Sequence, residues 1–339
     1  MATTKKKDFK SKLEEFKAKK STTTKYKPQE YLSCGSVFGA VTGIPGPAIG
    51  HINMLLGHSN SSKTSCLILA AIDSQKKGRL PVFCITEQKW DFDHLKLMGF
   101  KCEKDPEDGE WKGDFIFKND FQYIEQVTDF INECLDEQAK GEIDMGLDFF
   151  WDSVGSIPCQ MTLAGKGGKQ QTAGVLADKI GMGLNQRITG SRFLSAPYTN
   201  TLTIVNQPWV ERAATPMSQP KIKPKGGEAI YLNATLVFIF GNQSGSGVTK
   251  LDATLNGRKV AYATRTKISV DKNHINGLGF KDGKLIITPH GYIFDTKQDI
   301  DAYKDTCKDY WKILFGVDDL SGVMLDESDD QVDTVTYED

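Results

Sequence analysis

The stretch that decides the fold is residues 52–76, INMLLGHSNSSKTSCLILAAIDSQK. Its first residues form a short apolar run that predicts a buried strand, and the residues from Lys63 onward predict a helix. Between them lies Gly57–Thr64, GHSNSSKT, which matches the phosphate-loop pattern G-x-x-x-x-G-K-S/T except that Ser62 replaces the second glycine. Backbone N–H groups at such a strand–loop–helix junction bind phosphate oxygens, so the segment predicts a nucleotide site.

Within this loop the side chains have separate expected roles. Lys63 would reach the β- and γ-phosphates of ATP, and the Thr64 hydroxyl would bind Mg²⁺. Ser62 places a Cβ where backbone and phosphate approach closely, so a serine-rich turn before a helix remains the alternative interpretation. The candidate nucleotide ligands are Gly57, Ser59, Asn60, Ser61, Ser62, Lys63, Thr64 and Ser65.

Two later strands end in carboxylates. The apolar run MGLDFFWDS ends at Asp152, a candidate Mg²⁺ ligand, and LPVFCIT is followed by Glu87, a candidate general base. Carboxyl ends of parallel strands share one edge of the sheet, where ligands bind. The alternatives are a helix N-cap for Asp152 and an ordinary surface glutamate for Glu87.

Short apolar strands alternate with helical stretches over residues 50–243. This alternation predicts an α/β fold whose central sheet is mostly parallel, with helices on both faces. Further strands are expected at 259–270 and 284–295, and a helix at 297–314. We divide the chain into a basic N-terminal helix and linker (1–30), a core (31–295), a C-terminal helix (296–317) and an acidic disordered tail (318–339).

The charge is unevenly distributed over the 339 residues, although the net charge is only −2. Residues 1–27 carry ten lysines against three acids, and residues 318–339 carry nine acids and no Lys or Arg. Phe9, Leu13 and Phe16 form a narrow apolar stripe that predicts an amphipathic helix at 5–20, either a solvated tail or a docking helix. The tail is either a solubilising segment or a competitor for basic loops.

Compartment and redox state follow from what the sequence lacks. Its seven cysteines are scattered without a C-x-x-C pair, which indicates reduced thiols rather than a disulfide framework or a zinc site. The N-terminal lysines are not followed by an apolar stretch, and we expect a cytoplasmic protein without a membrane partner.

Two segments, 156–172 and 208–227, are rich in Gly, Pro, Lys and Gln and are expected to be irregular functional loops. Trp209 is a candidate either for stacking on a base or for the core. Basic side chains in or near these loops predict salt-sensitive phosphate contacts with DNA. With the glycines that close the second loop, the candidates are Lys166, Lys169, Lys179, Arg187, Arg212, Lys221, Lys223, Lys225, Gly226 and Gly227.

Over residues 30–295 these motifs, in this order, resemble the RecA family of DNA recombinases, nearest to its phage UvsX-type branch. The resemblance includes Leu32–Ser36 (LSCGS), Pro45–Gly50 (PGPAIG), the Glu87 region, Thr203–Gln207 (TIVNQ) and Gly226–Ile230 (GGEAI). It implies a RecA-like P-loop NTPase core with an N-terminal helix and a small C-terminal extension. The two loops would then line a filament axis and contact DNA.

The resemblance also implies roles for single residues. Gln207 would sense the γ-phosphate and couple it to the second loop. Arg265 and Lys267 would reach the ATP of a neighbouring subunit, as arginine fingers do. Asp91 and His94 would lie near the adenine.

The function expected from these observations is a DNA-dependent ATPase that uses ATP and Mg²⁺, forms a helical filament on single-stranded DNA and exchanges strands with homologous duplex DNA. Its further candidate partner is a single-strand-binding or loading protein. Two alternatives remain: a hexameric helicase-type ATPase with the same core, or a coat protein that binds nucleotide and single-stranded DNA without hydrolysis.

Overall fold

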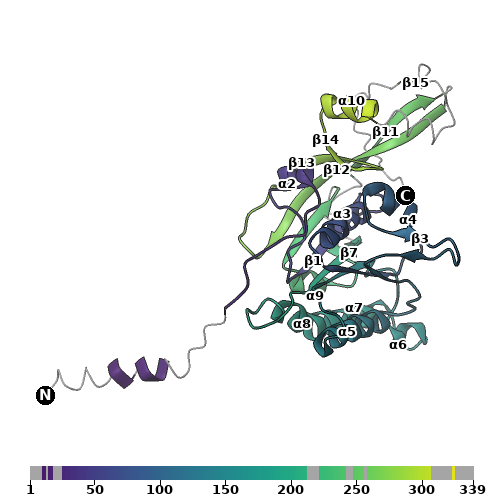
Figure 1. The fold of residues 1–339 in the computed structure, drawn as a ribbon. Helices are drawn as coiled ribbons and strands as arrows, with labels where there is room; N and C mark the ends of the chain where they lie inside the picture. Colours follow the sequence, from purple (N-terminus) through teal and green to yellow (C-terminus); the bar gives the residue numbers. More distant parts are fainter. Residues whose placement is uncertain are drawn as a thin grey trace.

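The computed structural model describes residues 10–12, 14–17, 25–211, 221–241, 247–255, 258–306 and 323–324. Its centre is one large sheet flanked by helices (Figure 1). Along the main path the strand order is β14, β13, β12, β10, β1, β7, β6, β2, β5. Their bounds are β1 Ile52–Gly57, β2 Leu80–Ile85, β5 Ile116–Lys118, β6 Leu147–Asp152, β7 Thr201–Asn206, β10 Leu236–Phe240, β12 Arg258–Asn273, β13 Gly283–Thr288 and β14 Gly291–Phe294.

The strands from β10 to β5 are all parallel, whereas β12, β13 and β14 join one edge in antiparallel pairs. Strands β1, β6, β7 and β10 are buried along their whole length. Continuous burial is typical of parallel strands that are covered on both faces, because both sets of alternating side chains meet helices. The expectation of an α/β fold with a mostly parallel sheet is therefore confirmed.

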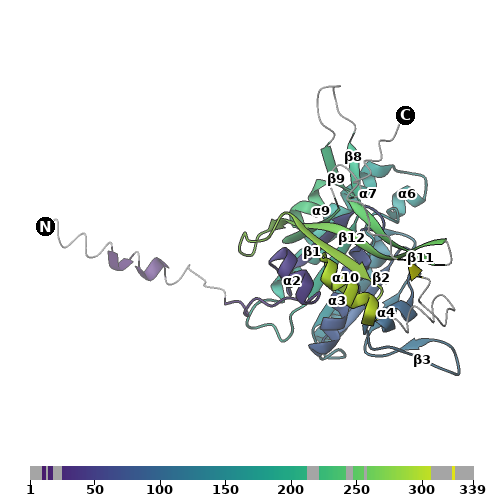
Figure 2. The same ribbon diagram turned by 90° about the horizontal axis from the view of Figure 1, so that it is seen from above.

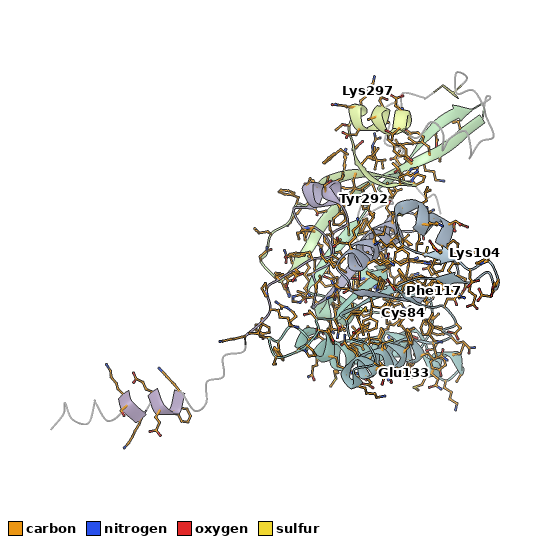
Figure 3. All side chains as sticks on the ribbon, in the orientation of Figure 1. Cys84, Lys104, Phe117, Glu133, Tyr292 and Lys297 are labelled. Atoms are coloured by element: carbon orange, nitrogen blue, oxygen red, sulfur yellow. The ribbon has the colours of Figure 1, made fainter. Side chains whose placement is uncertain are left out.

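Helices cover both faces of this sheet. On one face lie α2 (Ser36–Thr42), α3 (Lys63–Lys76) and α4 (Phe92–Met98), and their core includes Leu55, Leu67 and Phe83. On the other face lie α5 (Ile124–Lys140), α7 (Lys169–Asp178), the π-helix η1 (Lys179–Leu184), α8 (Asn185–Gly190) and α9 (Glu228–Asn233). Figure 3 labels Cys84, a buried β2 residue that faces the α5 layer, and Glu133 on the outer side of α5.

Several elements differ from the sequence expectation. The single strand expected at 284–295 is a hairpin of β13 and β14, turned by Thr288 Oγ1, which donates to Gly291 O at 2.9 Å. The two segments expected to be irregular contain α6 (Gln160–Leu163), the start of α7, and the paired strands β8 (Pro208–Glu211) and β9 (Lys221–Pro224). Local hydrogen bonds explain the difference; for example, Gln171 Oε1 accepts from Gly168 N at 2.8 Å where α7 begins.

Smaller elements lie around the core. Strands β3 (Glu103–Lys104) and β4 (Trp111–Lys112) form a separate hairpin, and β11 (Val248–Leu255) pairs with β12. The hairpin of β11 and β12 extends away from the parallel part of the sheet, beside α10 (Lys297–Thr306), whose Lys297 is labelled in Figure 3.

The N-terminal helical residues 10–12 and 14–17 are exposed and lie apart from the core in both views (Figures 1 and 2). Of the expected apolar stripe, Phe16 is described and exposed, whereas Phe9 and Leu13 lie outside the described residues. Within the acidic tail only β15 (Val323–Met324) is described, and it pairs with β11. Across the described part of the chain, no helix combines the length and apolarity needed to cross a membrane.

Candidate nucleotide site

The phosphate loop joins the end of β1 to the start of α3. Only glycine fits at position 57, because neighbouring atoms approach it closely. An added Cβ would lie 2.4 Å from Phe240 O and 2.7 Å from Ser61 Oγ. Ser62 adopts φ 74°, in the left-handed region that favours glycine. Its buried hydroxyl has no hydrogen-bond partner among the described residues, while its carbonyl accepts from the Tyr292 hydroxyl at 3.1 Å. The backbone thus keeps the conformation of the glycine that the sequence lacks.

Lys63 is buried at the first position of α3, and its ammonium points back over the loop. It donates to His58 O at 2.6 Å and lies 3.4 Å from Ser61 Oγ. Burial lowers the pKa of Lys63 to about 8, although the nearby Asp152 and Glu87 carboxylates act in the opposite direction. A cation held at this desolvated position would be stabilised by a phosphate, whose negative charge would replace the solvation that burial removes.

Thr64 and Asp152 are joined directly, although one stands on α3 and the other ends β6. Thr64 Oγ1 donates to Asp152 Oδ2 at 2.7 Å. Burial raises the pKa of Asp152 to about 6, and the Glu87 charge adds to this, whereas the Thr64 hydrogen bond and the Lys63 charge oppose it. A hydroxyl and a carboxylate at one point are the ligands that Mg²⁺ takes together with phosphate oxygens.

Glu87 lies beside Asp152 because β2 and β6 are neighbours, with Ile85 paired to Asp152. Glu87 Oε1 accepts from Ser153 Oγ at 2.6 Å, and Thr86 Oγ1 donates to Ser153 O at 2.7 Å. The Asp152–Ser153 peptide bond is cis. The Ser153 hydroxyl therefore fixes one oxygen of Glu87, and the carboxylate is held at the edge where a water molecule could be polarised.

These residues fit Mg²⁺–ATP. The N-terminus of α3 and the buried Lys63 ammonium suit phosphate oxygens. Within the described ranges, no group of three or more His, Cys, Asp or Glu side chains is placed to hold a metal. A Mg²⁺ ion on Thr64 and Asp152 would therefore take its remaining ligands from phosphate oxygens and water.

Gln207 follows β7, the strand between β1 and β6. Its side-chain oxygen accepts from Lys225 Nζ at 2.7 Å, and its carbonyl accepts from Lys225 N at 2.9 Å. Gly226 and Gly227 follow with φ of 85° and 91°. Gln207 and Lys225–Gly227 form the neck of the β8–β9 hairpin. A Cβ at Gly226 would lie 2.7 Å from Leu176 Cδ1, so this neck packs tightly on α7.

The two basic residues expected to act on a neighbour are paired within this chain. Arg265 Nε lies 2.8 Å from Asp295 Oδ1, and Lys267 Nζ lies 2.9 Å from Asp282 Oδ1. Both stand on β12, two strands from β1. Among the described residues their ion pairs are with these carboxylates rather than with the phosphate loop, and Arg265 must exchange its partner before it can bind an anion.

Asp91 and His94 have local partners. Asp91 caps α4 by accepting from Asp93 N at 3.0 Å and from His94 N at 3.4 Å. Burial lowers the pKa of His94, against the effect of the Asp91 carboxylate. A capping role for Asp91 needs no nucleotide, and its place near an adenine stays a prediction.

The candidate DNA-binding residues fall into different surroundings. Lys166 is exposed, whereas Lys179 lies 3.5 Å from Asp129 and Arg187 lies 2.6 Å from Asp136, both on α5. Trp209 on β8 is 55% exposed, so its interpretation as a core residue is wrong. Lys169 begins α7, and Lys221 and Lys223 lie on β9, but the structure does not describe the side chains of these three lysines. Arg212 lies outside the described residues.

Three residues that contact the candidate nucleotide site were not predicted for it from the sequence: Ser153, Tyr292 and Lys225. Ser153 directly follows Asp152, and its position was the only signal for its contact with Glu87. Tyr292 gave no local signal, because it meets Ser62 from a strand 230 positions later. The sequence predicts a DNA contact for Lys225, yet its side chain contacts Gln207 at the nucleotide edge.

Comparison with known proteins adds nothing to this geometry: no protein-family model matches the chain, and no curated protein matches it significantly.

Proposed function

We propose that this protein is an ATP-dependent DNA strand-exchange protein with a RecA-like P-loop core, which polymerises on single-stranded DNA. The observation that carries the proposal is the convergence of Lys63, Thr64, Glu87, Asp152 and Gln207 at one edge of the sheet. These five residues come from four separate parts of the chain, so a chance match to a single motif does not explain their meeting.

Each residue then has one chemical task. Bound Mg²⁺–ATP would supply the γ-phosphoryl group to be transferred to water and the divalent charge that balances its oxygens. Lys63 would neutralise phosphate charge, and Thr64 with Asp152 would hold the metal. Glu87, fixed by Ser153, would orient and deprotonate the attacking water.

DNA binding is proposed for the two segments that follow β6 and β7. Both leave the same sheet edge as the nucleotide residues, and the second segment packs on α7, the helix that continues the first, where Gly226 lies against Leu176. Exposed Lys166 and Trp209 suit a backbone contact and a stacking contact that accept any sequence. A nucleotide bound at this sheet edge would thus lie next to the segments proposed to hold DNA.

The test is ATP hydrolysis with and without single-stranded DNA at two salt concentrations. Lys63→Ala is compared with Lys76→Ala, which removes an exposed lysine from the other end of the same helix. We expect DNA to stimulate turnover, salt to weaken the stimulation, Lys63→Ala to be inactive and Lys76→Ala to behave as wild type.

Electron microscopy of the protein on DNA with a non-hydrolysable ATP analogue completes the test. Helical filaments support the recombinase, whereas closed rings favour the hexameric helicase-type ATPase. DNA coating without any hydrolysis favours the coat protein. Hydrolysis that is indifferent to DNA and to Lys63→Ala would overturn the proposal.

A further inference from the structure

Lys225 closes the neck of the β8–β9 hairpin. Its N–H donates to Gln207 O at 2.9 Å, and its carbonyl accepts from Asn206 Nδ2 at 2.9 Å. Its ammonium donates to Gln207 Oε1 at 2.7 Å. Three hydrogen bonds thus tie one lysine to the last residue of β7 and to the residue after it.

The side chain of Lys225 runs toward the nucleotide edge rather than into solvent. Its stem covers Gly155, where an added Cβ would lie 2.8 Å from Lys225 Cδ. Gly155 follows the Asp152–Ser153 end of β6, and Val154 N donates to Val205 O at 3.0 Å. The half-buried Lys225 therefore lies over the ends of β6 and β7.

The charge of Lys225 acts on Lys63, the lysine of the phosphate loop. The pKa of Lys63 is lowered mainly by burial, and the Lys225 charge lowers it further. The Asp152 and Glu87 carboxylates lie at this edge together with the two ammonium groups, Lys63 and Lys225, which repel each other. A polyanion placed there would interact favourably with both.

The present partner of Lys225 is a weak one. Gln207 Oε1 is a neutral amide oxygen, whereas a phosphate oxygen carries charge and accepts a stronger hydrogen bond from an ammonium group. A terminal phosphate at the edge would compete with Gln207 for the same Nζ. The exchange would free the Gln207 amide at the moment the triphosphate is bound.

We propose that Lys225 is a phosphate-binding cation, supplied by the chain itself from the neck of the hairpin, that recognises the γ-phosphate and distinguishes ATP from ADP. The inference rests on the proposed nucleotide site and goes beyond it, because it moves Lys225 from the DNA-binding set to the nucleotide. It also connects the terminal phosphate to the β8–β9 hairpin through one side chain.

The test is calorimetric titration of the full-length protein with Mg²⁺–AMP-PNP and, separately, with Mg²⁺–ADP. Lys225→Gln removes the charge but keeps an amide donor for Gln207, and Lys225→Arg keeps the charge. Lys76→Ala is the control for loss of an exposed lysine. Thermal unfolding without nucleotide checks that each variant is folded.

We expect Lys225→Gln to weaken AMP-PNP binding by about tenfold or more, as for loss of a hydrogen bond to a charged group. ADP binding should change less than about twofold, and Lys225→Arg should retain most of the preference for the triphosphate. Equal loss for both nucleotides, or no loss for either, would overturn the role of Lys225 while leaving the nucleotide site intact. If the wild type binds neither nucleotide, or if Lys63→Ala binds them normally, the proposed function fails together with this inference.

Discussion

Thr64 Oγ1 donates a 2.7 Å hydrogen bond to Asp152 Oδ2 across 88 positions of sequence. The contact crosses from the first turn of α3 to the end of β6, although β7 separates β6 from β1 in the sheet. Such a contact would preorganise the two proposed Mg²⁺ ligands before nucleotide arrives, and preorganised ligands bind with a smaller ordering cost.

The first prediction concerns these two ligands. Asp152→Asn should reduce the Mg²⁺-dependent part of ATP binding by roughly 10- to 100-fold, because a charged metal ligand is lost. Asp129→Asn, which alters an exposed carboxylate on α5, is the control. Titration calorimetry with and without Mg²⁺ measures the effect; equal Mg²⁺ dependence in both variants would exclude Asp152 as a ligand.

The second prediction is the pH dependence of stability without nucleotide. Burial raises the pKa of Asp152 from 3.8 to about 6, so between these values the folded protein binds a proton that the unfolded chain has lost. The contribution of Asp152 to the free energy of unfolding therefore falls as pH rises from about 4 to 6, by roughly 3 kcal/mol. Urea unfolding at several pH values should show this slope in the wild type and a weaker one in Asp152→Asn. Identical slopes would contradict it.

The third prediction follows from the left-handed backbone of Ser62. The order of stability should be Ser62→Gly, then Ser62→Ala, then Ser62→Val, since a Cβ at positive φ costs about 1–2 kcal/mol and branching adds to it. Ser62→Gly also removes a buried hydroxyl without a hydrogen-bond partner in the part of the chain that the structure describes. Urea midpoints measure the order. A valine variant as stable as the glycine variant would show that the residue does not need positive φ.

The fourth prediction tests whether Arg265 acts on a neighbouring subunit. Arg265→Ala should bind ATP normally but lose DNA-stimulated hydrolysis, because its site would lack the stabilising cation. Mixing it with Lys63→Ala should restore part of the activity, since the second variant still supplies Arg265 to its neighbour. Mixing Lys63→Ala with Glu87→Ala should restore none, because both changes damage the same side of the interface. No recovery in the first mixture would contradict the action of Arg265 on a neighbouring subunit.

The fifth prediction concerns the exposed Trp209 on β8. Trp209→Ala should weaken single-stranded DNA binding by about 1–3 kcal/mol through loss of base stacking, and Trp209→Phe should lose less. Fluorescence anisotropy with labelled DNA measures both. Trp111→Phe, which changes a ring stacked on Phe92, is the control. Equal affinity for Trp209→Ala and wild type would exclude stacking.

Much of the fold could be predicted from local patterns. The apolar run before Gly57 and the helix from Lys63 are properties of adjacent residues, and the structure places β1 and α3 there. The runs ending near Glu87 and Asp152 likewise became β2 and β6. In their described parts the two segments expected to be irregular also contain short helices and strands, because hydrogen bonds such as that between Gln171 and Gly168 are too local and too sparse to leave a periodic signal.

The sequence alone therefore determined which residues have the chemistry for phosphate and metal, since that depends on residue type at short spacing. Only the tertiary structure decided which of them meet. The strand order brought Asp152 to Thr64 and Glu87 to Ser153, and it brought Tyr292 to the carbonyl of Ser62. It also paired Arg265 with Asp295 and turned Lys225 toward Gln207. These contacts join residues that are distant in sequence, and their energies depend on burial and geometry that no local pattern encodes.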